Sequence, residues 1–131
     1  MLPLSYPTRW RFAGIFLLLA VLAVAMAPAF WPWLGAGGSR LFVDKWMHGF
    51  TFVLLAIWYA GQYERRYYGW LILGLLVFGG LIEICQSMVT YRTAELADFF
   101  ADALGVLVGI LIAVAGLGGW SLRFESWLKD R

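Results

Sequence analysis

The stretch YGWLILGLLVFGGLIEICQSM, residues 68–88, decides what kind of protein this chain is. It contains a single charged residue, Glu83, among side chains that are otherwise almost all apolar. A helix of this length rises about 32 Å, which is enough to cross a hydrocarbon core of about 30 Å. The stretch therefore predicts a membrane-spanning helix with one acid inside it.

The composition of the whole chain agrees with a membrane protein. Of 131 residues, 63% are hydrophobic and 14% are charged, against about 45–50% and about 25% in soluble domains. The length suits one domain, residues 1–131, and the net charge of +2 gives a nucleic-acid partner no general electrostatic support. Cys85 is the only cysteine, which excludes an intrachain disulfide and a cysteine-based metal cluster.

Three further apolar stretches predict an all-α polytopic bundle of four transmembrane helices. Prolines and glycines at 28–38 break the chain after the first stretch, and Asp44 is a suitable N-cap for the second. The tail, residues 120–131, alternates aromatic and charged residues and predicts an amphipathic helix at the interface. The predicted spans are residues 12–31, 45–61, 68–88 and 97–117.

The first span has an alternative interpretation as a cleaved signal peptide. Arg9 and Arg11 precede it, and Ala25-Met26-Ala27 has the small residues of a cleavage site. We favour a retained span, because the apolar run is long, further spans follow, and Pro28 directly after the motif obstructs cleavage.

The loops predict the orientation of the bundle. Arginine and lysine gather on one side of the four spans and are sparser on the other, and the positive-inside rule places both termini on the basic, cytoplasmic side. The basic side carries Arg9, Arg11, Arg65, Arg66, Arg123, Lys129 and Arg131; the other side carries Arg40, Lys45 and Arg92.

The remaining polar residues gather at the extracytoplasmic ends of the second, third and fourth spans. Residues three or four apart share one face of a helix, as Glu83 and Gln86 do, and as Asp98 and Asp102 do. Counted from the predicted helix ends, His48, Glu83 and Asp102 lie about 6–8 Å inside. Charged groups at that depth are costly next to lipid, so we expect them to face one another inside the bundle.

Acids outnumber bases in this group, and small residues follow it along the fourth span. Ala101, Gly105 and Gly109 form a smooth stripe that predicts close helix packing. Because of the charge imbalance, we expect some acids to be protonated, hydrated or matched by a cation. The acids are Asp44, Glu83, Glu95, Asp98 and Asp102, against Arg40, Lys45 and Arg92.

Three ordered motifs in residues 40–112 resemble the VanZ-like family of membrane proteins. They are Asp44-Lys45-x-x-His48-x-x-x-Phe52, then Gly80-x-x-Glu83-x-x-Gln86, then Arg92-x5-Asp98-x3-Asp102-x-x-Gly105-x3-Gly109. The resemblance implies a multi-pass protein of the bacterial plasma membrane with a connection to teicoplanin-type glycopeptide resistance or envelope homeostasis. Family members often carry Asn where this chain has Asp102, which puts in doubt any role that needs a neutral amide there.

Three functions and one structural alternative fit these residues. The first function is binding of a lipid head group or a lipid-linked envelope precursor in a polar cleft. The second is a membrane-embedded enzyme with His48 and Glu83 as its acid and base. The third is a transport or proton-relay element, which would need an oligomer. The structural alternative is a buried polar core that locks the helices together. The predicted ligand-binding residues are Asp44, Lys45, His48, Glu83, Gln86, Arg92, Asp98 and Asp102.

No metal or cofactor is predicted. One histidine among several carboxylates is compatible with a divalent cation. However, the chain has no HExxH motif and no Cys/His ligand spacing. Ser39 and Ser87 lie near the polar group, but neither belongs to a nucleophile elbow.

Overall fold

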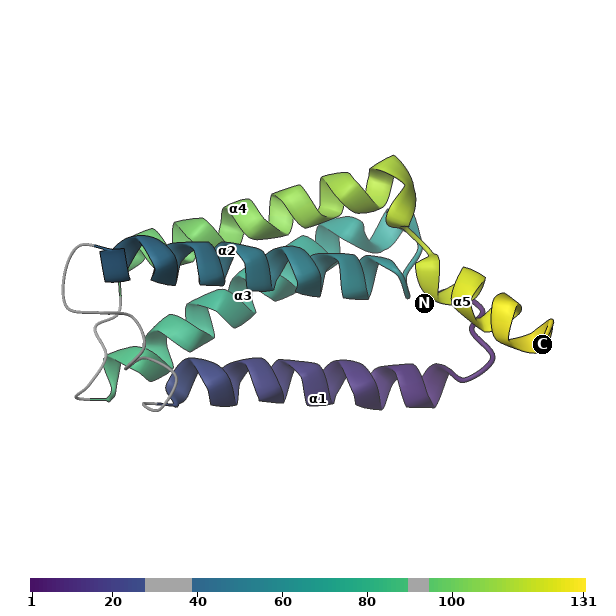
Figure 1. Ribbon diagram of the computed structural model, residues 1–131, viewed down its shortest axis with the longest axis horizontal. Helices are drawn as coiled ribbons and strands as arrows, with labels where there is room; N and C mark the ends of the chain where they lie inside the picture. Colours follow the sequence, from purple (N-terminus) through teal and green to yellow (C-terminus); the bar gives the residue numbers. More distant parts are fainter. Residues whose placement is uncertain (28–38, 90–94) are drawn as a thin grey trace.

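The computed structural model describes residues 1–27, 39–89 and 95–131, with residues 39–44 described by their backbone alone. Every regular element in these ranges is helical. The long helices run antiparallel to their chain neighbours, so both ends of the chain lie at the same end of the bundle (Figure 1). The elements are α1 (Pro7–Met26), α2 (Ser39–Ala60), the 3-10 turn η2 (Arg65–Tyr67), α3 (Tyr68–Ser87), α4 (Leu96–Ile112), the π-helical turn η3 (Ala113–Leu117) and α5 (Trp120–Lys129).

Three helical segments in the described part of the chain are long and apolar enough to cross a membrane: Pro7–Met26, Arg65–Ser87 and Leu96–Leu117. They correspond to the first, third and fourth predicted spans. Large apolar side chains on them point outward, as Phe16, Val77 and Leu111 do. An exposed apolar belt of this kind suits a surface that faces lipid.

The helix that contains the first predicted span differs from residues 12–31 at both ends. The helix begins at Pro7, five residues before the apolar run, because proline suits the first turn and the polar residues 8–11 can remain helical outside the apolar region. It ends at Met26, since Ala27 is extended, with φ −80° and ψ 122°. The predicted continuation over residues 28–31 lies outside the described residues. Hydropathy thus located the apolar centre of α1 and misplaced its ends.

The predicted start of the second helix was also wrong. α2 begins at Ser39, so Asp44 lies inside the helix and is not its N-cap. The residues between, Arg40-Leu41-Phe42-Val43, contain no glycine or proline to stop a helix that starts directly after Gly38. His48 consequently lies about 14 Å along the axis from the start of α2, roughly twice the predicted depth.

The core lies between α2, α3 and α4, and α1 contacts it more sparsely (Figure 1). The closest packing is between α2 and α4. An added Cβ at Gly105 would overlap the backbone of Gly49, and one at Gly109 would lie 2.6 Å from the Val53 carbonyl oxygen. Glycine is therefore needed at these two positions of α4, because the α2 backbone occupies the space of a side chain.

α5 packs its polar face against the bundle. Ser121 and Glu125 are buried, and the Ser121 hydroxyl donates a hydrogen bond to the carbonyl of Gly61. Trp127 and Leu128, in contrast, are about half exposed. The predicted amphipathic tail is thus a helix that packs Trp120 against the bundle and turns Trp127 and Leu128 outward, as suits an element at a membrane interface.

Glu125 also holds the start of the chain. Its carboxylate accepts hydrogen bonds from the backbone N–H of Ser5 (2.6 Å), from that of Tyr6 (3.3 Å) and from Trp10 Nε1 (2.8 Å). Burial on its own would raise the pKa of Glu125, but these hydrogen bonds outweigh burial and lower the pKa below its ordinary value of 4.5. The negative charge also lies beside the N-terminus of α1, where the helix dipole favours it.

Acidification is expected to release this contact. Because the pKa of Glu125 is lower in the folded protein than in the unfolded chain, its contribution to stability is complete above pH 4.5 and is lost as the pH falls through the folded value. Thermal unfolding in detergent between pH 7 and pH 3 should therefore show a smaller loss of stability for Glu125→Gln than for the unsubstituted protein. Identical pH profiles for the two proteins would contradict this assignment.

Candidate functional site

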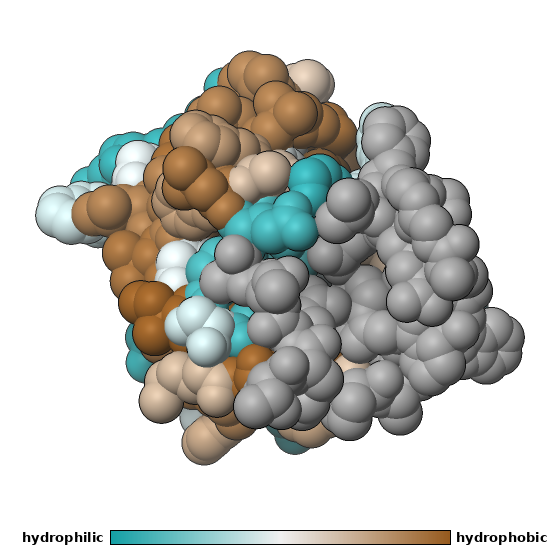
Figure 2. Space-filling model, turned by 90° about the vertical axis from the view of Figure 1, so that its left-hand side faces the viewer, coloured by the Kyte–Doolittle hydropathy of each residue, from teal (hydrophilic) through white to brown (hydrophobic). Residues whose placement is uncertain are grey.

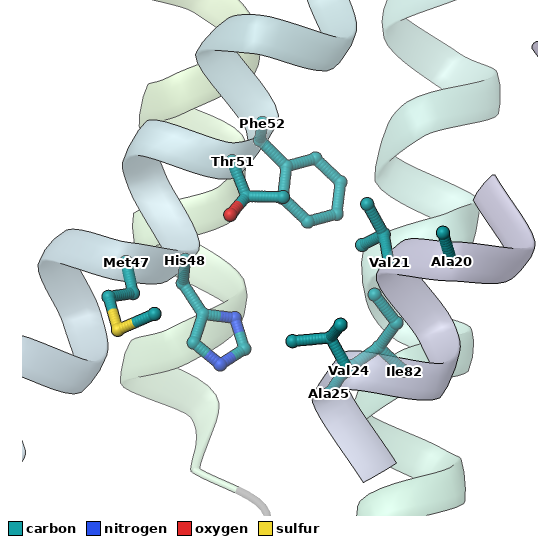
Figure 3. A pocket seen from close by; sticks show the side chains of 9 residues that line it. All are labelled: Ala20, Val21, Val24, Ala25, Met47, His48, Thr51, Phe52 and Ile82. Atoms are coloured by element: carbon teal, nitrogen blue, oxygen red, sulfur yellow. The ribbon is translucent and has the colours of Figure 1, made fainter. Parts of the chain in front are cut away.

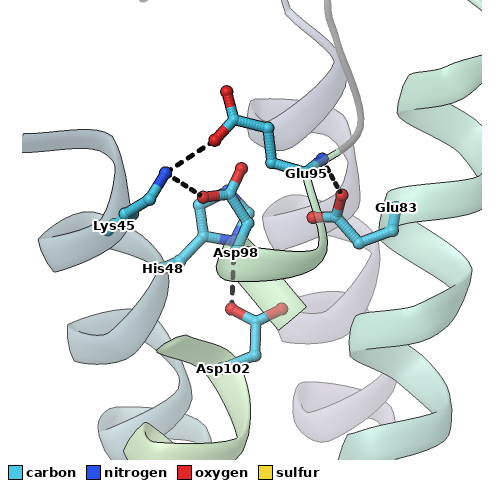
Figure 4. A network of polar contacts seen from close by, with 6 residues as sticks. All are labelled: Lys45, His48, Glu83, Glu95, Asp98 and Asp102. Atoms are coloured by element: carbon cyan, nitrogen blue, oxygen red, sulfur yellow. Dashed lines mark hydrogen bonds and ion pairs between the residues drawn. The ribbon is translucent and has the colours of Figure 1, made fainter. Parts of the chain in front are cut away.

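A polar network connects α2, α3 and α4 at the end of the bundle opposite the termini (Figure 4). Lys45 Nζ on α2 lies 2.8 Å from Glu95 Oε2 and 3.2 Å from Asp98 Oδ1. His48 Nδ1, one turn further along α2, lies 3.0 Å from Asp102 Oδ1 on α4. The contacts of Asp98 and Asp102 join α2 to α4, the two helices that pack most closely. Seen from this end, hydrophilic side chains form a patch beside hydrophobic ones (Figure 2).

Glu83 connects α3 to the same network. Its Oε2 accepts a hydrogen bond of 3.1 Å from the backbone N–H of Glu95, the residue that caps α4. Its Oε1 is buried and has no hydrogen-bond partner among the described residues. Glu83 thus satisfies a helix terminus with one oxygen and leaves a second oxygen unsatisfied, which is costly in a buried position.

The network is buried to different degrees. The side chains of Asp98 and Asp102 are 2% and 0% exposed, and that of His48 is 8% exposed, whereas those of Lys45 and Glu95 are about one-third exposed. Gly79 on α3 makes room for Asp102, since an added Cβ there would lie 3.0 Å from Asp102 Oδ2. The site therefore grades from a partly open entrance at Lys45 to a closed interior at Asp102.

His48 also lines a pocket between α1, α2 and α3, with a volume of about 220 Å³ (Figure 3). Apart from His48 and Thr51, the side chains around this pocket are apolar, and the picture shows the imidazole pointing toward α1. One histidine thus borders both the polar network and an apolar pocket. The other lining residues are Ala20, Val21, Val24, Ala25, Met47, Phe52 and Ile82.

The structure brings five of the predicted ligand-binding residues into this network: Lys45, His48, Glu83, Asp98 and Asp102. Gln86 differs, because its Nε2 donates a hydrogen bond of 3.0 Å to the carbonyl of Ala25 and so connects α3 to the end of α1. The side chain of Asp44 and the whole of Arg92 lie outside the described residues. Ala101, Gly105 and Gly109 belong to the contact between α2 and α4.

Glu95 is a member of the network that the predicted site omitted. Its charge was counted among the acids of the sequence. Glu95 was not assigned to the site, because the residue lay in a predicted loop, where helical spacing predicts nothing about its neighbours. It contributes through its side chain to Lys45 and through its backbone N–H to Glu83. The signal that pointed to it was its place three residues before Asp98, as the cap of α4.

The network contains one set of possible metal ligands. A ring nitrogen of His48, a carboxylate oxygen of Glu83 and one of Asp98 all lie within 4.8 Å of one another. The three residues come from three different helices, so no local sequence motif predicts that they lie together.

Comparison with known proteins places the chain in a family. It is 34% identical over 120 residues to an uncharacterized protein of the fungus Schizosaccharomyces pombe, and the match covers 87% of this chain and 70% of the relative. The chain belongs to the same family as that fungal protein. No protein-family model matches the chain, and no solved structure matches it.

Proposed function

We propose that the chain is a VanZ-like integral membrane protein that binds a lipid head group at its polar network. Four helices, α1 to α4, span the membrane with both termini in the cytoplasm, and the network opens to the extracytoplasmic side. The observation that carries the proposal is His48, which borders a charged network on one side and an apolar pocket on the other. An amphiphile needs such a pair of adjoining surfaces, one for its head group and one for its chain.

The arrangement of the ends supports the orientation. Both termini and the turn at Arg65–Tyr67 lie at one end of the bundle (Figure 1). That end carries the larger set of basic residues, and the network around Lys45 lies at the other end. α2 has 22 residues, about 33 Å, and packs along α4 over its length, which supports its inclusion as a fourth span.

The charges of the network favour a head group that donates hydrogen bonds. Among the described residues, four carboxylates face one lysine and one histidine. Lys45 already contacts two of these carboxylates, those of Glu95 and Asp98. An amine or a set of hydroxyl groups would bind the carboxylates directly. A phosphate would find one remaining N–H of Lys45 and would be repelled by the surrounding carboxylates.

The fungal relative is uncharacterized and names no ligand. We place the lipid head group before a lipid-linked envelope precursor because the network and the adjoining apolar pocket suit an amphiphile. A connection to the bacterial plasma membrane or to glycopeptide resistance rests on the VanZ-like motifs alone.

Loss of the network carboxylates is expected to abolish lipid retention. Native mass spectrometry of the purified protein should identify a bound lipid, and Glu83→Gln and Asp98→Asn should each lower its occupancy about tenfold. Hydrogen bonds to charged groups contribute about 1.5–3 kcal/mol, and 1.4 kcal/mol is tenfold in affinity. Glu64→Gln and Asp130→Asn, which make the same changes at the opposite end, should leave occupancy unchanged.

Two outcomes would contradict lipid binding. One is equal lipid occupancy in all four variants, which would indicate annular lipid held by the apolar belt. The other is loss of the folded protein from the membrane in both network variants, which would favour the structural polar core. The amount of inserted protein is therefore measured in parallel with occupancy.

A second candidate function is a membrane-embedded enzyme that acts on a lipid-linked substrate. His48 is favoured as its base because Asp102 contacts Nδ1 at 3.0 Å, an orienting contact found in acid–base catalysis. Glu83 lies close enough to be the acid. Turnover that disappears in His48→Ala would support this function, and full activity of His48→Gln in cells would exclude it.

A further inference from the structure

Three side chains able to coordinate a metal converge on one point of the network. His48, Glu83 and Asp98 bring their ligand atoms within 4.8 Å of one another from α2, α3 and α4. Two atoms bound at about 2.1 Å to one tetrahedral ion are about 3.4 Å apart. The three atoms therefore need to draw together by up to about 1.4 Å, which rotations of the two carboxylates can supply.

Each of the three side chains has a second contact that fixes its direction (Figure 4). Asp102 contacts Nδ1 of His48, Lys45 contacts Oδ1 of Asp98, and the N–H of Glu95 contacts Oε2 of Glu83. Metal-binding histidines and carboxylates are typically oriented by such outer contacts, with a carboxylate against the imidazole as a common form. The network thus has the support that a coordinating set needs.

An unsatisfied oxygen atom of Glu83 also favours a cation at this position. Oε1 of Glu83 is buried without a hydrogen-bond partner among the described residues. Around it, in the part of the chain that the structure describes, four carboxylates face Lys45 and His48, and buried negative charge is most costly at membrane depth. A divalent cation would satisfy this oxygen and offset the excess charge in one step.

We infer that His48, Glu83 and Asp98 form a binding site for a divalent transition-metal ion of the Zn²⁺ or Mn²⁺ type. One imidazole and two carboxylates are ligands that both ions accept, whereas Mg²⁺ prefers oxygen ligands and retains its water. Three protein ligands leave at least one position of the ion open for water or another small ligand. The inference does not depend on lipid binding, because the metal is tested alone.

The single histidine of the chain makes the inference directly testable. Protein purified without a histidine tag and labelled with ¹⁵N-histidine gives one imidazole spectrum. Zn²⁺ added to one molar equivalent is expected to shift a ring-nitrogen signal of His48 and then to saturate, whereas Mg²⁺ leaves both signals in place. Imidazole signals that do not change in tenfold excess Zn²⁺ would overturn the site.

Affinity measurements assign the two carboxylates. Glu83→Gln and Asp98→Asn are each expected to weaken Zn²⁺ binding more than about tenfold in equilibrium dialysis, since even outer contacts of a metal site contribute about 10–100-fold. Glu64→Gln, at the opposite end, should bind as the unsubstituted protein does. Unchanged affinity in both network variants would refute their role as ligands. If a variant does not fold, the histidine spectrum of the unsubstituted protein decides the question by itself.

Failure of this site and failure of the proposed lipid function are distinguishable. A protein that retains lipid but shows no Zn²⁺-dependent histidine shift refutes the metal alone. A protein that binds Zn²⁺, but whose lipid occupancy does not change in Glu83→Gln and Asp98→Asn, refutes the lipid function alone.

Discussion

Gly105→Ala is expected to lower the free energy of unfolding by about 2 kcal/mol. The new Cβ would overlap the backbone of Gly49 on α2, so the two helices with the closest contact in the bundle would have to separate. Overpacking costs about 1–3 kcal/mol, and the higher helix propensity of alanine returns at most about 1 kcal/mol. We expect packing to dominate because the obstacle is backbone, which cannot rotate away. Reversible unfolding in mixed detergent and SDS micelles measures the difference.

Gly74 provides the matched control for this substitution. It lies inside α3, where an added Cβ would meet nothing within 4 Å. Gly74→Ala should therefore leave stability unchanged or raise it by up to about 1 kcal/mol through helix propensity alone. Equal effects of the alanine at Gly74 and at Gly105 would show that α2 and α4 do not pack as closely as described.

Asp102→Ala is expected to be more destabilising still, by about 3–5 kcal/mol. Asp102 is fully buried and contacts His48, itself 8% exposed, so its removal leaves an imidazole in a closed polar interior without that carboxylate. Breaking a buried contact between a carboxylate and a protonated imidazole from one side has a cost of this size. The measurement is again reversible unfolding, with cellular accumulation of the protein as a second readout.

Asp102→Asn separates the shape of this contact from its charge. An amide oxygen at the position of Oδ1 can keep the hydrogen bond to His48, so we expect a loss of only about 1 kcal/mol. Asp130→Ala, on the exposed end of α5, should change stability by less than about 0.5 kcal/mol. If Asp102→Ala behaved like Asp130→Ala, the contact between α2 and α4 at this level would be dispensable.

Hydropathy and turn residues predicted the helical class, three spans that the structure confirms as apolar enough to cross a membrane, and the helical tail. They predicted helix ends less well, because they report where apolar residues stop and not where hydrogen-bonded backbone stops. α1 begins at Pro7, before its apolar run, whereas α2 begins at Ser39 and already contains the apolar residues 41–43 before Asp44. The first difference comes from helical residues outside the apolar run, and the second from apolar residues that the predicted N-cap excluded.

Helical spacing predicted which polar residues share a face, but not which of them touch. The i, i+4 relation placed Asp98 and Asp102 together, whereas the structure pairs each with a different residue of α2, Lys45 and His48. Such pairs depend on the relative rotation and register of two helices, which are determined by Gly105 and Gly109 against the α2 backbone. The spacing of residues within one helix does not predict that register.

The contact of Glu125 with Ser5 has a consequence for how the protein is made. The two residues are 120 positions apart, so Ser5 leaves the ribosome well before its partner Glu125 has been synthesised. Until then its backbone N–H groups have only water or lipid head groups to bind, and α1 must insert without this contact. Completion of the tertiary structure is therefore a late, post-insertional event, and a nascent chain arrested before α5 should expose its N-terminal segment to protease.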